Sequence, residues 1–95
     1  MKYICYFEFD EECLDDVVPK FQEMIKLRET GDYPAGVTPT YWVPGDMHGL
    51  TIYDVDDPQQ ITNHYLHYFP MMKLTWKPLI EASDFVQSYL KKKKA

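Results

Sequence analysis

The sequence predicts an α+β fold in which one antiparallel sheet carries helices on one face. Residues 2–9 alternate apolar and mixed side chains, as a strand does. Residues 37–57 hold two runs rich in β-branched and aromatic side chains around a Pro-Gly loop, which is typical of a β-hairpin. Amphipathic helical segments flank this hairpin. The order β-α-β-β-α-β, followed by a short terminal helix, is the ferredoxin-like plan.

The length and composition describe one small, aromatic-rich domain. The chain has 95 residues, of which 45% are hydrophobic and 16% aromatic. We expect a single domain at 1–90, followed by a lysine-rich tail at 91–95. A domain of this size buries only roughly 60–65% of the surface of its unfolded chain. Surplus aromatic side chains therefore indicate apolar surface that a partner subunit or a ligand covers.

The net charge argues against a nucleic-acid partner, and the lengths of the apolar runs argue against a membrane segment. A formal net charge of −5 argues against nucleic acid, because phosphate binding needs a basic stripe, and the one basic block is Lys91–Lys94. No apolar run approaches the ~20 residues that span a bilayer, so we expect no membrane segment. Cys5 and Cys13 make no disulfide framework, and the acidic start is unlike a signal peptide. A cytoplasmic location is the expectation.

The first third of the chain predicts a strand and a helix. One strand face is uniformly apolar and should pack beneath helices, while the other is mixed: Tyr3, Cys5, Phe7 and Phe9 against Lys2, Ile4, Tyr6 and Glu8. We expect the helix at 16–29, with Asp16 as its N-cap, Pro19 in its first turn and Gly31 as its stop. Its buried stripe follows 3.6-residue spacing: Leu14, Val17, Val18, Phe21, Met24, Ile25 and Arg28.

The hairpin loop is expected at 44–49. It should lead into a strand with Leu50, Ile52 and Asp54 on one face and Thr51, Tyr53 and Val55 on the other. Asp57-Pro58 predicts the start of a second helix, which should run to Phe69. Its expected apolar stripe is Ile61, Tyr65, Tyr68 and Phe69.

The end of the chain predicts a strand at 71–79, near whose end Pro78 favours an edge position. Met72, Leu74 and Trp76 should share one of its faces, and Lys73, Thr75 and Lys77 the other. Ser83-Asp84 should cap a short helix that buries Phe85, Val86, Tyr89 and Leu90.

The uncovered face of the predicted sheet is too apolar to face water. It carries Ile4 and Tyr6 with either Leu50 or Tyr53, depending on strand register. Two sheets packed face to face would cover it, so the sequence predicts a homodimer.

Several short motifs follow one another in an order that resembles a small family of unknown function within the dimeric α/β-barrel superfamily. They are Met1-Lys2-Tyr3, Glu29-Thr30-Gly31, Pro34-Ala35-Gly36-Val37, Trp42, His48-Gly49-Leu50, Asp54-Val55-Asp56-Asp57-Pro58 and Leu74–Leu79. The chain departs from the family at Asp54, where Glu is common, at Tyr68, where Trp is usual, and in a longer segment before the first helix. The resemblance implies the dimeric barrel. It implies no single chemistry, because the superfamily includes cofactor-free oxygenases, isomerases, haem-degrading enzymes and plain ligand binders.

Two residues are candidate acid–base catalysts, and each has a plainer interpretation. His48 is close in sequence to Trp42 and Asp54, and imidazole titrates near neutral pH. A turn histidine that caps a carbonyl would give the same pattern. Asp54 shares a strand face with apolar neighbours, so its carboxylate must pair, protonate or face water. Solvent exposure near the strand end is the simpler alternative.

Four aromatic residues are candidate ligand contacts. Aromatic walls with a few polar groups make small-molecule pockets, and these four should converge between sheet and helices: Tyr6, Trp42, Tyr65 and Trp76. An aromatic core or dimer interface would need the same residues. His64 and His67 can share a helix face, but catalytic zinc normally takes three protein ligands, so we predict exposed histidines with no metal or cofactor.

The sequence favours a homodimeric module that binds a small organic molecule or another partner. A cofactor-independent enzyme is the alternative, with His48 or Asp54 moving a proton on an aromatic or carbonyl compound. The sequence shows no recognisable nucleophile–base pair, so whether the protein is an enzyme stays open.

Overall fold

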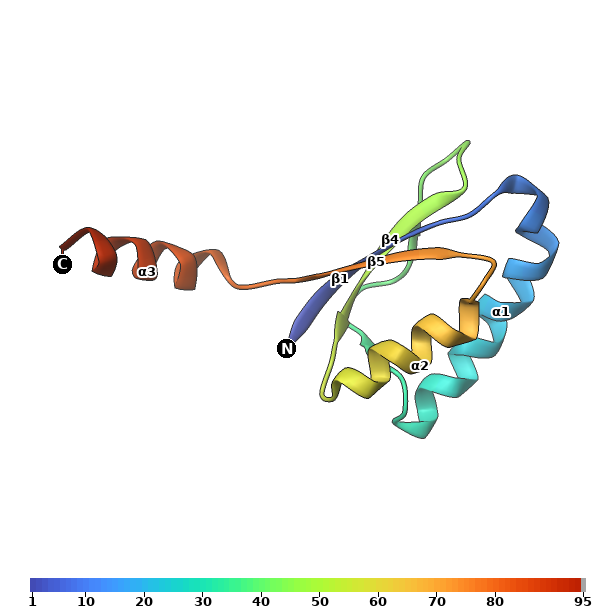
Figure 1. The fold of residues 1–95 in the computed structure, drawn as a ribbon, viewed down its shortest axis with the longest axis horizontal. Helices are drawn as coiled ribbons and strands as arrows, with labels where there is room; N and C mark the ends of the chain where they lie inside the picture. The colour runs from blue at the N-terminus through green and yellow to red at the C-terminus, as the bar shows by residue number, and fades with distance from the viewer. Residues whose placement is uncertain (95) are drawn as a thin grey trace.

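A computed structural model describes residues 1–94 as a sheet, two helices packed on it and a third helix that extends away (Figure 1). The strands are β1 (Lys2–Glu8), β2 (Ala35–Gly36), β3 (Tyr41–Trp42), β4 (His48–Asp54) and β5 (Lys73–Pro78). The helices are α1 (Leu14–Leu27), α2 (Pro58–Tyr68) and α3 (Ala82–Lys94), with 3₁₀ turns at Glu11–Cys13 and Arg28–Thr30.

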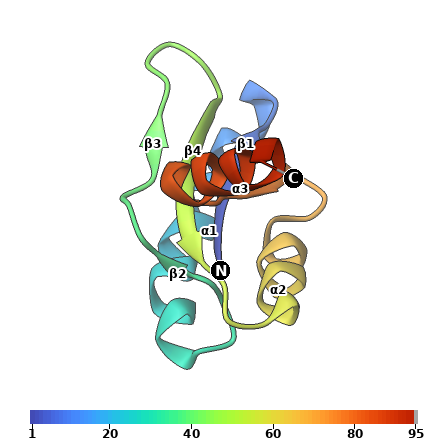
Figure 2. The same ribbon diagram turned by 90° about the vertical axis from the view of Figure 1, so that its left-hand side faces the viewer.

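The sheet is antiparallel, with the order β2-β4-β1-β5 and β3 also paired with β4. β2 and β3 follow one another along the same side of β4 (Figure 2). β1 is central, and Phe7 lies opposite Gly49 on one neighbour and Leu74 on the other. This arrangement is the predicted ferredoxin-like α+β fold, and β5 takes the predicted edge position.

The core lies between the sheet and the helices α1 and α2. Strand alternation is as predicted, since Cys5 and Phe7 of β1 and Tyr53 of β4 are buried on the helix side. The helices and the segment after α2 complete the core with Val17, Met24, Tyr68 and Met72. No helix within residues 1–94 covers the opposite face of the sheet, and Tyr6 on that face is 41% exposed.

The predicted hairpin is present, but its first strand is divided into two short strands, β2 and β3. β2 and β3 are separated by a segment containing Pro39, whose missing N–H cannot join a ladder. Thr38 bridges the gap, because its hydroxyl accepts a hydrogen bond from the Ile52 amide at 3.1 Å. His48 and Gly49, which we expected in the loop, belong to β4 instead. Glycine is required there, because a Cβ at position 49 would lie 2.6 Å from Cζ of Phe7.

Helix α1 begins at Leu14, so the expected start at Asp16 was wrong. A 3₁₀ turn at Glu11–Cys13 leads directly into the helix, and Pro19 therefore lies inside it. The proline removes one hydrogen bond to the carbonyl of Asp15, which is exposed to water. The predicted stop is confirmed, since Gly31 ends the last turn in the left-handed region at φ 84°.

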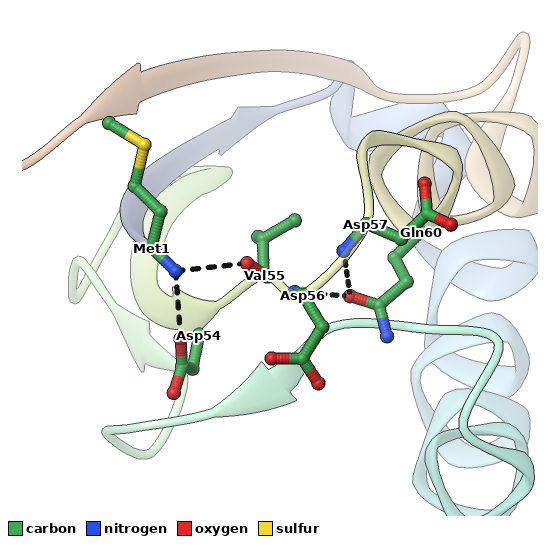
Figure 3. Close-up of polar contacts among 6 residues, drawn as sticks. All are labelled: Met1, Asp54, Val55, Asp56, Asp57 and Gln60. Atoms are coloured by element: carbon green, nitrogen blue, oxygen red, sulfur yellow. Dashed lines mark hydrogen bonds and ion pairs between the residues drawn. The ribbon is translucent and has the colours of Figure 1, made fainter.

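Helix α2 begins as predicted but turns a different face to the core. Asp57 is the N-cap and forms a capping box with Gln60. Gln60 is buried, and its side chain accepts hydrogen bonds from the amides of Asp56 and Asp57 (Figure 3). It also donates one to the Gly31 carbonyl. The buried stripe is Gln60, His64 and Tyr68, whereas Tyr65 and Phe69 are exposed. The expected exposure of His64 was therefore wrong, and so was that of His67, whose side chain is 8% exposed and whose Nε2 lies 3.0 Å from the Lys20 carbonyl.

Helix α3 lies well apart from the sheet and the other helices (Figure 1). Its predicted inner face is exposed in the single chain: Phe85, Val86, Tyr89 and Leu90 are 48–62% accessible. The helix runs through Lys94, so Lys91–Lys94 are helical rather than a frayed tail. Ala95 of the predicted tail lies outside the described residues.

Candidate functional site

A cavity of about 380 Å³ opens between α1, the end of α2 and the segment that carries β3. Its lining is mostly aromatic and apolar, with one cation and two hydroxyl groups, those of Thr40 and Tyr68. The lining residues are Phe21, Ile25, Arg28, Thr40, Trp42 and Tyr68. Small-molecule sites commonly measure about 300–1,000 Å³ and have this kind of lining. We call this cavity the α1–β3 pocket.

Side chains from α1, β3 and α2 form the walls of the α1–β3 pocket. Phe21, Ile25 and Arg28 recur at i, i+4 and i+7, so α1 and its 3₁₀ extension present them on one side. Trp42 covers the pocket from β3, with its ring centroid 6.0 Å from that of Phe21. Tyr68, the last residue of α2, packs against Phe21 at 5.5 Å. The pocket therefore depends on three separate elements.

Arg28 supplies the positive charge of the pocket. Its Nη2 donates a hydrogen bond to the Tyr53 hydroxyl at 2.8 Å, and its Cζ lies 5.1 Å from the centre of that ring. Its Nε is buried and finds no hydrogen-bond partner among residues 1–94. Within the same residues, no carboxylate forms an ion pair with Arg28. The guanidinium is thus a partly buried charge without a counter-charge.

His64 lies behind the pocket wall and is neutral. It is 2% exposed, and its ring centroid lies 5.1 Å from those of Tyr53, Tyr68 and Trp76. Burial, together with the nearby charges of Arg28 and His67, lowers the pKa of His64 to about 3. Among residues 1–94, neither its Nδ1 nor Nε1 of Trp76 has a hydrogen-bond partner.

Three further buried groups, Tyr53, Tyr68 and Cys5, are neutral as well. Burial raises the pKa of the Tyr53 hydroxyl, although the Arg28 charge opposes this, and burial also raises the pKa of Tyr68. Burial raises the pKa of the Cys5 thiol to about 12, so this cysteine is no nucleophile. Among the described residues that line the pocket, Arg28 is therefore the one that carries a charge.

The structure brings two of the four aromatic candidates to the helix side of the sheet. Trp42 lines the α1–β3 pocket, and Trp76 lies behind it against His64. Tyr6 lies on the opposite face, in a hollow of about 300 Å³ that it shares with His48. Tyr65 is exposed on α2 and contacts Phe69. The four side chains do not surround one space.

The two catalytic candidates lie at opposite ends of β4. His48 begins the strand, with its Nδ1 3.1 Å from the Asp46 carboxylate. Asp54 ends the strand, and the amino group of Met1 lies between its carboxylate, at 3.3 Å, and the Val55 carbonyl, at 3.0 Å (Figure 3). Both are surface contacts, and the two residues do not form a pair.

Sequence reasoning missed most of the pocket. One signal was present, since Arg28 stands at the end of the apolar stripe of α1 and a charge in such a stripe needs a partner. Tyr68 was assigned to the core, and Thr40 carried no signal at all.

The family model described as "Domain of unknown function (DUF3303)" matches residues 1–93. The chain belongs to this family. No curated protein matches it in sequence. Among solved structures, one described as "Crystal structure of antibiotic biosynthesis monooxygenase" is similar, with a TM-score of 0.55 and 12% identity. The match covers 85% of this chain and 100% of that one, and at this identity it shows the fold alone. None of the helices within residues 1–94 has the length and apolarity to cross a bilayer.

Proposed function

We propose that this protein is a cytoplasmic homodimer that binds a small organic molecule in the α1–β3 pocket. The observation that carries the proposal is the Arg28 guanidinium, which lines an aromatic cavity without an acidic partner in residues 1–94. A buried charge without a partner costs stability, so a folded protein retains one where something else uses it.

The shape of the pocket supports a ligand rather than a packing defect. Its apolar walls would surround a flat ring, while Arg28 and Thr40 would fix its orientation. Trp42 and Ile25 remain 37% and 67% exposed, so the cavity is reached from solvent. Binding would bury this apolar surface, which contributes roughly 25 cal/mol per Å².

A cofactor-independent enzyme is the second candidate, and the likeness to a structure described as a monooxygenase favours it. Such an enzyme needs a proton acceptor near its substrate. His48 and Asp54 stay the proposed acceptors, but both lie outside the α1–β3 pocket, and His64 with its pKa of about 3 is a weak base. Binding without turnover therefore fits the geometry better.

Native mass spectrometry of freshly purified protein tests the binding proposal. We expect a co-purifying small molecule that is lost in Trp42→Ala while the dimer persists. Tyr65→Ala is the matched control, because it removes another exposed aromatic ring that lies outside the pocket, and it should retain the adduct. An adduct that survives Trp42→Ala would place the ligand elsewhere.

The homodimer is proposed to form through the face of the sheet that α1 and α2 leave open. Ile4, Tyr6, Leu50 and Ile52 make this face apolar, and none of them is fully buried in the single chain. Light scattering should give twice the chain mass at micromolar concentration. Ile52→Asp should weaken the dimer, whereas Val18→Asp, at an exposed apolar residue of α1, should not. A monomeric wild type would contradict this part of the proposal.

A further inference from the structure

We infer that the ligand of the α1–β3 pocket is a planar aromatic carboxylate whose carboxylate group binds Arg28. This inference rests on the proposed function and adds the chemical class of the ligand. It comes from the pairing of one unneutralised guanidinium with aromatic walls, in a pocket that contains no acidic side chain.

The Arg28 guanidinium has N–H donors that a ligand could use. An arginine carries five N–H donors in a rigid fork. Among residues 1–94, Arg28 uses this fork for a single protein acceptor, the Tyr53 hydroxyl. A carboxylate matches the fork geometry and forms shorter, stronger hydrogen bonds than a neutral acceptor does. Binding of a carboxylate would also neutralise the charge that the fold leaves unpaired.

Thr40 supplies a second polar contact beside Arg28. Its hydroxyl oxygen accepts a hydrogen bond from Thr51 at 2.7 Å. A hydroxyl group has one proton to donate, so Thr40 remains able to donate it to a ligand oxygen. Thr51 is a buried residue of β4, so its hydrogen bond to Thr40 fixes the orientation of the Thr40 hydroxyl.

The neutral surroundings select a monoanion with an aromatic ring. Trp42 packs edge-on and Tyr68 packs tilted against Phe21, and a flat ring can pack against such faces. A cation would meet the Arg28 charge without any carboxylate to balance it. A phosphate dianion would need further cations or a set of backbone N–H donors, and Arg28 is the one cation in the lining.

Isothermal titration with two matched probes tests the inference. The probes are 2-naphthoate and 2-naphthamide, which share a ring but differ in charge. We expect 2-naphthoate to bind at least about tenfold more tightly, because its carboxylate forms a bidentate ion pair with the guanidinium whereas the amide offers one neutral acceptor. Arg28→Met should abolish this preference, with a larger loss of affinity for 2-naphthoate than for the amide. Lys26→Met, an exposed substitution with the same loss of charge, should keep the preference.

The possible outcomes separate the ligand class from the pocket. Equal binding of both probes by the wild type would overturn the carboxylate assignment and leave the pocket standing. An unchanged preference in Arg28→Met would also overturn it. Binding of neither probe by the folded wild type would overturn both the inference and the pocket. If Arg28→Met fails to fold, Arg28→Lys replaces it, and a preference as large as that of the wild type would count against the fork geometry.

Discussion

The buried imidazole of His64 should make the protein sensitive to acid. With its ordinary pKa of 6.5 lowered to about 3 in the folded state, His64 takes up a proton in the unfolded chain well before it does so in the native one. The unfolded state therefore binds more protons between these two values. Stability rises with pH across that window and is fully present above about pH 6.5.

The size of the effect follows from the same two values. At pH 5 the unfolded His64 is almost fully protonated and the folded one is neutral, so the free energy of unfolding falls by about 2 kcal/mol relative to pH 7. The groups that face His64 agree with this direction. Tyr53, Tyr68 and Trp76 are neutral, and Arg28 disfavours a second positive charge.

Urea denaturation at pH 7 and pH 5, at one fixed protein concentration, measures the difference. His64→Gln lowers the stability at both pH values but should lose about 2 kcal/mol less than the wild type between them. His48→Gln, at a partly exposed surface position beside Asp46, should follow the wild type within about 0.5 kcal/mol. If His64→Gln and the wild type lose equal stability on acidification, the imidazole is not buried as described.

Five further substitutions test the fold and the proposed dimer. Gly49→Ala should lower the free energy of unfolding by about 1–3 kcal/mol or more, because the new methyl group meets the Phe7 ring and the Tyr41 carbonyl. The methyl group of Gly45→Ala meets no atom within 4 Å, so this substitution should cost about 1–2 kcal/mol through the positive φ alone. Thermal melts compare the two variants. Asp57→Ala should remove about 1 kcal/mol by loss of the α2 cap, while Asp56→Ala, which gives up no side-chain hydrogen bond within residues 1–94, should be nearly neutral. Tyr6→Asp should weaken the proposed dimer in light scattering without changing the circular dichroism spectrum.

The elements that sequence reasoning predicted well are those with strong local signals. Alternation in β1 identified the buried face, because a strand with one covered side must repeat every two residues. Asp57-Pro58 identified the start of α2 through capping chemistry that needs no distant contact. Gly31 stopped the first helix for a similar local reason.

The site was poorly predicted because it depends on tertiary contacts. Tyr68 of the expected α2 stripe is buried, and Ile61 packs against the core. Hydrophobicity ranks Tyr65 above His64, so the expected stripe contained Tyr65 and Phe69 where the structure buries Gln60 and His64. One side-chain hydrogen bond of Gln60 reaches the carbonyl of the distant Gly31, and no local pattern in the sequence shows it. Arg28 meets Tyr53 only once α1 lies over β4. The predicted inner face of α3 is uncovered in a single chain, so local sequence cannot say what covers it.

A chemical-shift map of isotope-labelled protein titrated with 2-naphthoate would locate the ligand on the molecule. We expect changes at the backbone amides and side chains that line the α1–β3 pocket, with the largest at Arg28 and Trp42. The hollow on the opposite sheet face, at Tyr6, Thr75 and Lys77, should remain unchanged. Changes that concentrate in that hollow and spare Arg28 would contradict binding in the α1–β3 pocket.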